Sequence, residues 1–286
     1  MRPEIFGIPI DPLTRDGFVE QVREAIRTKR HLLVATVNTE WLMRTLRDPT
    51  FRELLLQADL RTADGSGILW AATFLSLPWR GPLWSIWQMI YSGASLTLYP
   101  RFCRRVLPEL LPGSQLAPQL AEMGQKEGWR IFLLGAGPGV AEKVASQWQG
   151  KFAALQIATS DADPDQDRAL PLIREFRPDI IMVAYTAPDQ LVWVKQHQSK
   201  LPPFVGIGIG GTLDYIAGTT TVRVSGVARL LKAHRPPRLV SSLGLEWLWR
   251  LLTQPWRLPR TSEAVPKFII NVLQYRSDLA TRFKSN

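Results

Sequence analysis

The chain has 286 residues, 45% of them hydrophobic, and a single cysteine, Cys103, so it can fold around a large core without disulfides. We find no signal-peptide pattern and no run of about 18 apolar residues, which disfavours secretion and a membrane-spanning helix and favours a reducing cytoplasm. The net charge of +10 is concentrated in residues 223–286, where twelve Lys/Arg face three Asp/Glu; the first 222 residues hold 23 basic and 22 acidic residues.

Short apolar runs that are followed by polar or glycine-rich loops and then by amphipathic stretches recur along the chain. Such alternation predicts an α/β fold, a Rossmann-like and mostly parallel sheet with helices on both faces. Ligands bind at the carboxyl ends of the strands in such sheets, so the loops there are the candidate sites. The expected strands are 31–37, 129–134, 179–184 and 204–209, and the expected helices include 41–57 and a helix that ends near Trp148.

Two stretches rich in aromatic residues and arginine depart from this alternation, at about 77–105 and after about residue 239. Trp at headgroup depth and Arg beside phosphate are typical of interfacial membrane segments, but both stretches are also compatible with ordinary core helices. We therefore expect an α/β core over residues 1–238 and a basic, helical, membrane-associating appendage over 239–286. The charge of the tail calls for an anionic partner: nucleic acid, an anionic membrane or a diphosphate.

A glycine-rich loop, Gly135-Ala136-Gly137-Pro138-Gly139, follows the strand at 129–134. Glycines allow backbone N–H groups to approach a phosphate at a helix N-terminus, so this loop predicts phosphate binding. The third glycine of a dinucleotide fingerprint would fall on Val140, and the expected acidic residue after the next strand is missing. NAD binding is therefore disfavoured.

Three sets of titratable residues remain. Asp64 lies in a glycine-flanked loop after 60–62, which suits a general base as well as an ordinary turn aspartate. The Asp161 to Asp167 run suggests a divalent metal, but its place between a strand and a helix favours a solvated loop, and we expect no metal site. None of His31, His197 and His234 is expected to have a carboxylate partner in these loops.

A series of short blocks follows the expected strand ends along nearly the whole chain. They are Thr36-Val37-Asn38-Thr39-Glu40, residues 58–67 (ADLRTADGSG), 112–116 (PGSQL), 132–141 (FLLGAGPGVA), 188–193 (PDQLVW), 210–218 (GGTLDYIAG), 235–237 (RPP) and 244–251 (GLEWLWRL). Taken in order, these blocks resemble the WecG/TagA/CpsF glycosyltransferase family. Their shared order is far more specific than any single block.

The resemblance implies an inverting, metal-independent enzyme that moves an N-acetylmannosamine-like sugar from UDP to an undecaprenyl-diphosphate-linked sugar in cell-surface polysaccharide synthesis. It implies no cofactor beyond the UDP-sugar donor. Asp64 would be the base, and Thr36, Asn38 and Gln190 would hold the sugars. Donor binding would involve Gly135, Gly137, Gly139, Gly210, Gly211 and Asp214, and the acceptor diphosphate would meet Arg250, Arg257 and Arg260.

Several positions depart from the family pattern. Gln115, Asp189 and Leu191 replace residues of other charge, about thirteen residues are inserted at 220–232, and the 77–105 stretch is longer. These changes affect sugar specificity more than reaction class.

The expected location is the cytoplasm, peripheral on the inner face of the plasma membrane, and a homo-oligomer is possible. The alternative is a nucleotide-sugar-binding or membrane scaffold protein without turnover. Nucleic acid is not an expected partner, since no nucleic-acid-binding motif accompanies the basic tail.

Overall fold

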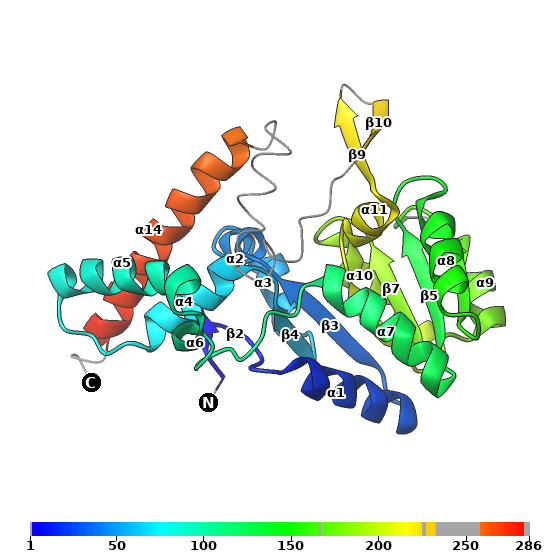
Figure 1. Cartoon of the computed structure of the whole chain (residues 1–286), viewed down its shortest axis with the longest axis horizontal. Coiled ribbons are helices and arrows are strands. Elements are labelled where there is room, and N and C mark those ends of the chain that lie inside the picture. The colour runs from blue at the N-terminus through cyan, green and yellow to red at the C-terminus, as the bar shows by residue number, and fades with distance from the viewer. Residues whose placement is uncertain (1, 166, 225–226, 233–257, 283–286) are drawn as a thin grey trace.

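The computed structural model describes residues 2–165, 167–224, 227–232 and 258–282. Strands and helices alternate through much of the first 218 residues, interrupted by the four successive helices between β4 and β5 (Figure 1). They are β1 Glu4–Ile5, β2 Ile8–Pro9, α1 Arg15–Arg27, β3 Leu32–Val37, α2 Thr39–Thr45, α3 Pro49–Leu56, β4 Leu60–Ala63, α4 Ser66–Ser76, α5 Pro82–Leu98, α6 Pro100–Cys103, α7 Gly113–Glu127, β5 Arg130–Gly135, α8 Val140–Lys151, β6 Gln156–Ser160, α9 Ala169–Phe176, β7 Ile180–Ala184, α10 Asp189–His197, the 3-10 turn η1 Gln198–Lys200, β8 Val205–Gly208, α11 Thr212–Ala217, β9 Thr219–Val224, β10 Val227–Lys232 and α14 Leu258–Arg282.

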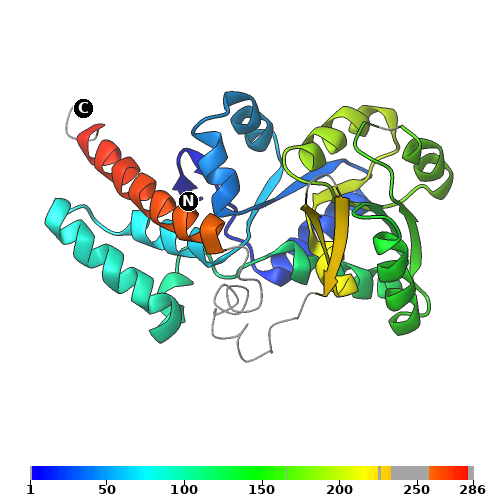
Figure 2. The same cartoon turned by 90° about the horizontal axis from the view of Figure 1, so that it is seen from above.

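Six strands form one parallel sheet in the order β4-β3-β8-β7-β5-β6. Along β3, Leu32 and Val34 belong to one core cluster, whereas Leu33 and Ala35 belong to the other. Both faces are therefore buried, which explains why the strands are continuous apolar runs. Helices α1, α7, α8 and α11 contribute to one cluster, and α2, α3, α4, α9, α10 and α14 contribute to the other (Figure 2). The predicted fold class is confirmed.

An aspartate just before a strand joins that strand to its neighbour at two places in the sheet. The Asp59 carboxylate accepts a hydrogen bond from the Leu33 N–H at 2.7 Å, and the Asp59 N–H donates to the Leu33 carbonyl at 2.9 Å. Asp179 makes the same pair of bonds with Arg130, both at 2.8 Å. Each aspartate thereby satisfies both backbone groups at the start of a buried strand pair and sets its register.

The structure differs from the sequence prediction in the helix expected over 41–57. The chain forms two helices there, because Asp48 accepts a hydrogen bond from the Phe51 N–H at 2.9 Å and Pro49 occupies the first turn of α3. Proline is tolerated at that position, where its missing N–H has no partner to lose, so a new helix begins. Of the residues predicted as an insertion, 220–224 and 227–232 lie in the paired antiparallel strands β9 and β10.

The C-terminal helix α14 packs against the first half of the chain. The Phe268 ring meets those of Phe6 and Trp70, at centroid distances of 6.0 and 6.2 Å, and Val272 is fully buried. The Gly7 N–H donates to the Tyr275 hydroxyl at 3.0 Å. This part of the expected appendage is thus joined to the core by buried contacts. The boundary at 239 lies outside the described residues and stays a prediction.

Candidate functional site

The predicted site residues converge on the carboxyl edge of the sheet. Strands β4, β3, β8, β7 and β5 are neighbours in that order, and they end at Ala63, Val37, Gly208, Ala184 and Gly135. In a parallel sheet these ends share one edge. The loops that carry Asp64, Asn38, Gly210 and Gly137 therefore come together, although they are far apart in the sequence.

Asp64 is half-buried and held by backbone contacts to the next strand. Its N–H donates to the Val37 carbonyl at 2.8 Å, and Gly65 has a φ of +110°, which favours glycine at the turn into α4. A Cβ on Gly67 would lie 2.5 Å from Thr39 Cγ2, so the loop packs directly on the start of α2. Asp64 is thereby placed beside the connection that contains Asn38.

Thr36 and Asn38 both have structural partners. The buried Thr36 hydroxyl donates to the Gly208 carbonyl at 2.8 Å and joins the ends of β3 and β8. Asn38 caps α2, since its Oδ1 accepts from the Trp41 N–H at 3.0 Å. These bonds fix the carboxyl ends of two adjacent strands, and sugar binding by the two residues stays a prediction.

Gln190 supports the glycine loop after β8. Its side chain is 2% exposed, and its Oε1 accepts a hydrogen bond from the Gly210 N–H at 2.8 Å. The bond is possible because Gly208 has no Cβ: one there would lie 2.9 Å from the Gln190 Cδ and Oε1 atoms. Gly210 has a φ of +51°, and Gly211 is exposed at the start of α11. Gln190 thus positions the loop that presents Gly210 and Gly211.

The loop Gly135 to Gly139 turns sharply from β5 into α8. Gly135 has a φ of +90°, and a Cβ there would lie 2.5 Å from the Tyr185 ring, whose hydroxyl donates to the Ala162 carbonyl at 2.6 Å. Burial raises the pKa of Tyr185, which keeps this hydroxyl protonated. Gly139 precedes the twelve-residue helix α8, whose N-terminus favours an anion. Phosphate binding by this loop stays a prediction.

The second donor-binding segment is α11, which packs against α8 and α7. Asp214 is half-buried in the first turn of α11. Donor binding by Asp214, which the resemblance implies at the uridine end, stays a prediction.

The Asp161 to Asp167 run lies between β6 and α9, as predicted, and Asp161 pairs with Arg168 at 3.6 Å. The prediction for His197 is wrong, however: its Nε2 lies 3.3 Å from the Asp167 carboxylate, and its Nδ1 lies 2.8 Å from the Trp193 carbonyl. The partners are 30 residues apart, so local sequence gave no signal for the pair. Within the described ranges no three His, Cys, Asp or Glu side chains group closely enough to hold a metal ion, and metal independence stays a prediction.

Of the three predicted acceptor arginines, Arg250 and Arg257 lie outside the described residues, and Arg260 lies in α14 with its side chain outside them. The part of α14 that is described approaches the site in an unexpected way. Gly67 comes three residues after Asp64, and a Cβ on it would lie 3.8 Å from the Phe268 ring. An apolar residue near the C-terminus thus packs beside the Asp64 loop, a contact that no sequence signal indicated.

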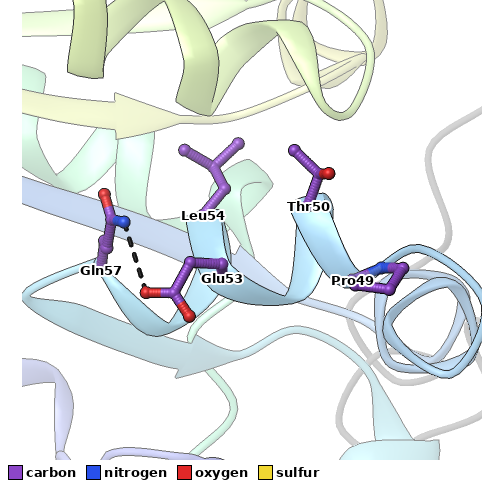
Figure 3. A pocket seen from close by; sticks show the side chains of 5 residues that line it. All are labelled: Pro49, Thr50, Glu53, Leu54 and Gln57. Atoms are coloured by element: carbon purple, nitrogen blue, oxygen red, sulfur yellow. Dashed lines mark hydrogen bonds between the residues drawn. The ribbon is translucent and has the colours of Figure 1, made fainter.

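A hollow elsewhere on the surface, with a volume of about 490 Å³, lies along α3 and is open to solvent (Figure 3). It contains one carboxylate, Glu53, whose Oε1 accepts a hydrogen bond from Gln57 at 3.4 Å. A second hollow, of about 270 Å³, lies at the opposite, amino edge of the sheet beside Phe204 and Val205. Neither hollow is lined by a predicted site residue, so the chemistry favours the carboxyl edge over both.

Comparison with known proteins supports the family resemblance over most of the chain. The sequence profile of the glycosyl transferase WecG/TagA/CpsF family matches residues 3–85 and 82–282. Among curated relatives, an N-acetylglucosaminyldiphosphoundecaprenol N-acetyl-beta-D-mannosaminyltransferase of Bacillus subtilis is 24% identical over 97% of this chain and 93% of its own length. A protein of the same description from Staphylococcus aureus is 23% identical over 94% of this chain and 91% of its own length.

Proposed function

Because this chain belongs to the WecG/TagA/CpsF family and is therefore a glycosyltransferase, we propose that it moves an N-acetylmannosamine-type sugar from UDP to a polyprenyl-diphosphate-linked acceptor sugar. The observation that carries the proposal is the position of Asp64. Asp64 lies half-buried at the carboxyl edge of the sheet, between the Asn38 connection and a glycine-rich turn, and in this proposal the acceptor hydroxyl meets its carboxylate there.

The proposed reaction is a single displacement with inversion. Asp64 takes the proton of the acceptor hydroxyl while that oxygen forms a bond to the anomeric carbon, and the bond from the anomeric carbon to the UDP oxygen breaks. The electron pair leaves with UDP, whose new charge would be stabilised by backbone N–H groups of the Gly135 to Gly139 loop and the α8 N-terminus. No step of this reaction requires a metal ion.

The substrates also suggest where the enzyme works. A polyprenyl-linked acceptor lies in a membrane, so the enzyme must meet the headgroup layer, and we propose a peripheral position on its cytoplasmic side. No helix in the described part of the chain has both the length and the apolar character needed to cross a membrane. The excess basic charge of residues 223–286 suits an anionic leaflet, and in this proposal Arg250, Arg257 and Arg260 would meet the acceptor diphosphate.

The test is a transfer assay with purified protein, UDP-N-acetylmannosamine and a short-chain N-acetylglucosaminyl-diphospho-polyprenol. We expect a disaccharide product with inverted anomeric configuration, identified by mass spectrometry and NMR, and release of one UDP per product. If the protein binds UDP-N-acetylmannosamine but forms no product with it or with any other UDP-hexosamine, the result would instead favour the non-catalytic scaffold.

A further inference from the structure

Helix α5 buries its polar side chains and exposes its apolar ones, the reverse of the usual arrangement in a protein surface helix. Its buried residues are polar and recur at helical spacing: Ser85, Gln88, Ser92 and Ser95. Its exposed residues are mostly large and apolar. They are, with exposed fractions, Leu83 (80%), Trp84 (47%), Ile86 (46%), Trp87 (65%), Ile90 (52%), Tyr91 (43%) and Leu98 (82%), followed by Tyr99 (53%) at the helix end. We call this set the α5 apolar face.

The inverted orientation is fixed by specific partners for the buried polar groups. The Trp70 indole N–H donates to the Ser92 hydroxyl at 3.1 Å, and the Arg276 guanidinium donates to Gln88 Oε1 at 2.6 Å. Ser95 Oγ lies 3.1 Å from Cys103 Sγ. If α5 were rotated to bury its apolar side, these polar groups would lose their partners, and buried polar groups without partners are costly. The apolar face is therefore held outward by contacts from α4, α6 and α14.

Charge next to the face indicates what covers it. Residues 77–108 contain no Asp or Glu, and their four arginines, Arg80, Arg101, Arg104 and Arg105, are all exposed. One lies before α5 and three lie in or just after α6, so cations flank the apolar face at both ends of α5. A second copy of the chain seated on this face, parallel or antiparallel, would bring arginine to arginine with no acidic residue of this segment to offset it.

A lipid surface complements every part of this pattern. Trp and Tyr prefer the headgroup level, Leu and Ile enter the acyl boundary, and arginine meets lipid phosphate. Helix α5 has 17 residues, and no described helix is suited to cross a membrane, so α5 would lie in the plane of the interface. Figures 1 and 2 show α5 beside α14, at the end of the molecule remote from α8 and α9.

We propose that the α5 apolar face and its flanking arginines form a docking surface for the anionic headgroup layer of a membrane. This inference rests on the proposed function in one respect, because the lipid-linked acceptor gives the docking its purpose. Helix α4 begins two residues after Asp64, and the chain then leads directly to α5. Because α4 also packs against α5 through Trp70 and Ser92, docking through α5 would hold the Asp64 loop in a fixed position relative to the interface where the acceptor diphosphate lies.

The test compares binding of the full-length chain to phosphatidylglycerol and phosphatidylcholine vesicles by sedimentation. We expect Trp87→Gln with Ile90→Gln to lower partition onto phosphatidylglycerol at least about tenfold without lowering the melting temperature, since both side chains are exposed. The matched control is Leu46→Gln with Leu172→Gln, which changes two apolar residues of similar exposure away from the face and should bind like the wild type. Arg101→Gln with Arg104→Gln should weaken binding at low salt and have little effect at about 1 M salt.

A second measurement does not depend on the mutated face staying folded. The emission of a fluorescent probe attached to Leu98→Cys should shift to shorter wavelength on phosphatidylglycerol vesicles, whereas that of the same probe on Leu172→Cys should not. The native Cys103 is buried and should therefore not react with the probe. Equal vesicle binding by Trp87→Gln/Ile90→Gln and wild type, or no shift at position 98, overturns the proposal. A wild-type dimer that this double variant converts to a monomer, with vesicle binding unchanged, would assign the face to a second copy instead.

The outcome is separable from that of the proposed function. Vesicle binding needs no sugar donor, so it can succeed when the transfer assay fails. If both proposals hold, the double variant keeps wild-type turnover on a short-chain soluble acceptor and loses transfer to a long-chain acceptor embedded in vesicles.

Discussion

The contact between Gly208 and Gln190 makes a sharp prediction about Gly208→Ala. The three nearest atoms to a Cβ at this position all belong to the Gln190 side chain, at 2.9, 2.9 and 3.1 Å. Gln190 must therefore move, and its 2.8 Å bond with the Gly210 N–H is lost or lengthened. Because that bond orients the loop of Gly210 and Gly211, we expect the substitution to disturb the candidate site from a fully buried position.

The size of the effect follows from the two interactions involved. Overpacking a core position costs about 1–3 kcal/mol, and a lost hydrogen bond costs about 0.5–1.5 kcal/mol. We expect Gly208→Ala to lower the free energy of unfolding by about 2 kcal/mol and turnover of folded enzyme about tenfold or more, since small misplacements of binding groups slow catalysis strongly.

A double-mutant cycle with Gln190→Ala isolates the contact. Gln190→Ala removes all three nearby atoms, so adding Gly208→Ala to it should cost almost nothing further. The matched control is Gly206→Ala, two residues earlier on β8, where the Cβ would lie 2.5 Å from the Val194 side chain. It should destabilise comparably and leave turnover of the folded fraction within about threefold. Additive costs in the cycle, measured by urea unfolding, would refute the reasoning.

Two further predictions concern the chemistry, and a third concerns the pH dependence of stability. Asp64→Asn should lower turnover about 100-fold or more, equivalent to about 2.7 kcal/mol, with UDP affinity by calorimetry within a few-fold, because the amide cannot accept the proton; near-normal turnover removes Asp64 from the mechanism. Activity should survive EDTA and the double change Asp161→Ala with Asp163→Ala, and a loss that manganese restores would argue for metal. Burial lowers the pKa of His31 in the folded state, so the unfolded chain takes up its proton first and stability should fall as pH drops through about 6.5. Thermal melts between pH 7.5 and 5.5 should show that the melting temperature of His31→Gln falls less with decreasing pH than that of the wild type. An equal dependence of melting temperature on pH in the two proteins would count against this role of His31.

Much of the sheet could be predicted from the sequence because each buried strand is a short apolar run with a polar or glycine end. The expected strand at 31–37 is β3, Leu32–Val37, and the expected strand at 179–184 is β7, Ile180–Ala184. The prediction of one helix over 41–57 was wrong in its interior, because Asp48 caps a new helix there and Pro49 occupies its first turn. That signal was present in the sequence and was outweighed by the apolar period around it.

The orientation of α5 could not be predicted from the sequence. Both an interfacial helix and a core helix explain its aromatic residues, and the choice depends on which side meets Trp70, Arg276 and Cys103. Those partners lie up to 188 residues away, and helical period does not indicate which stripe is buried. The role of Gln190 was hidden for a similar reason, because its partner Gly210 comes from a different strand end.

The pairing of β3 with β8 has a consequence for how the chain folds during synthesis. Ala35 pairs with Gly208, so the first strand of the six-stranded sheet in chain order lies beside its last. At a synthesis rate of about 5–20 residues per second, β3 waits on the order of ten seconds or more for its partner to leave the ribosome. During that interval one edge of β3 is an unpaired apolar strand, the kind of segment that aggregates. Expression of the full chain should therefore depend on chaperone supply more strongly than its native stability would suggest.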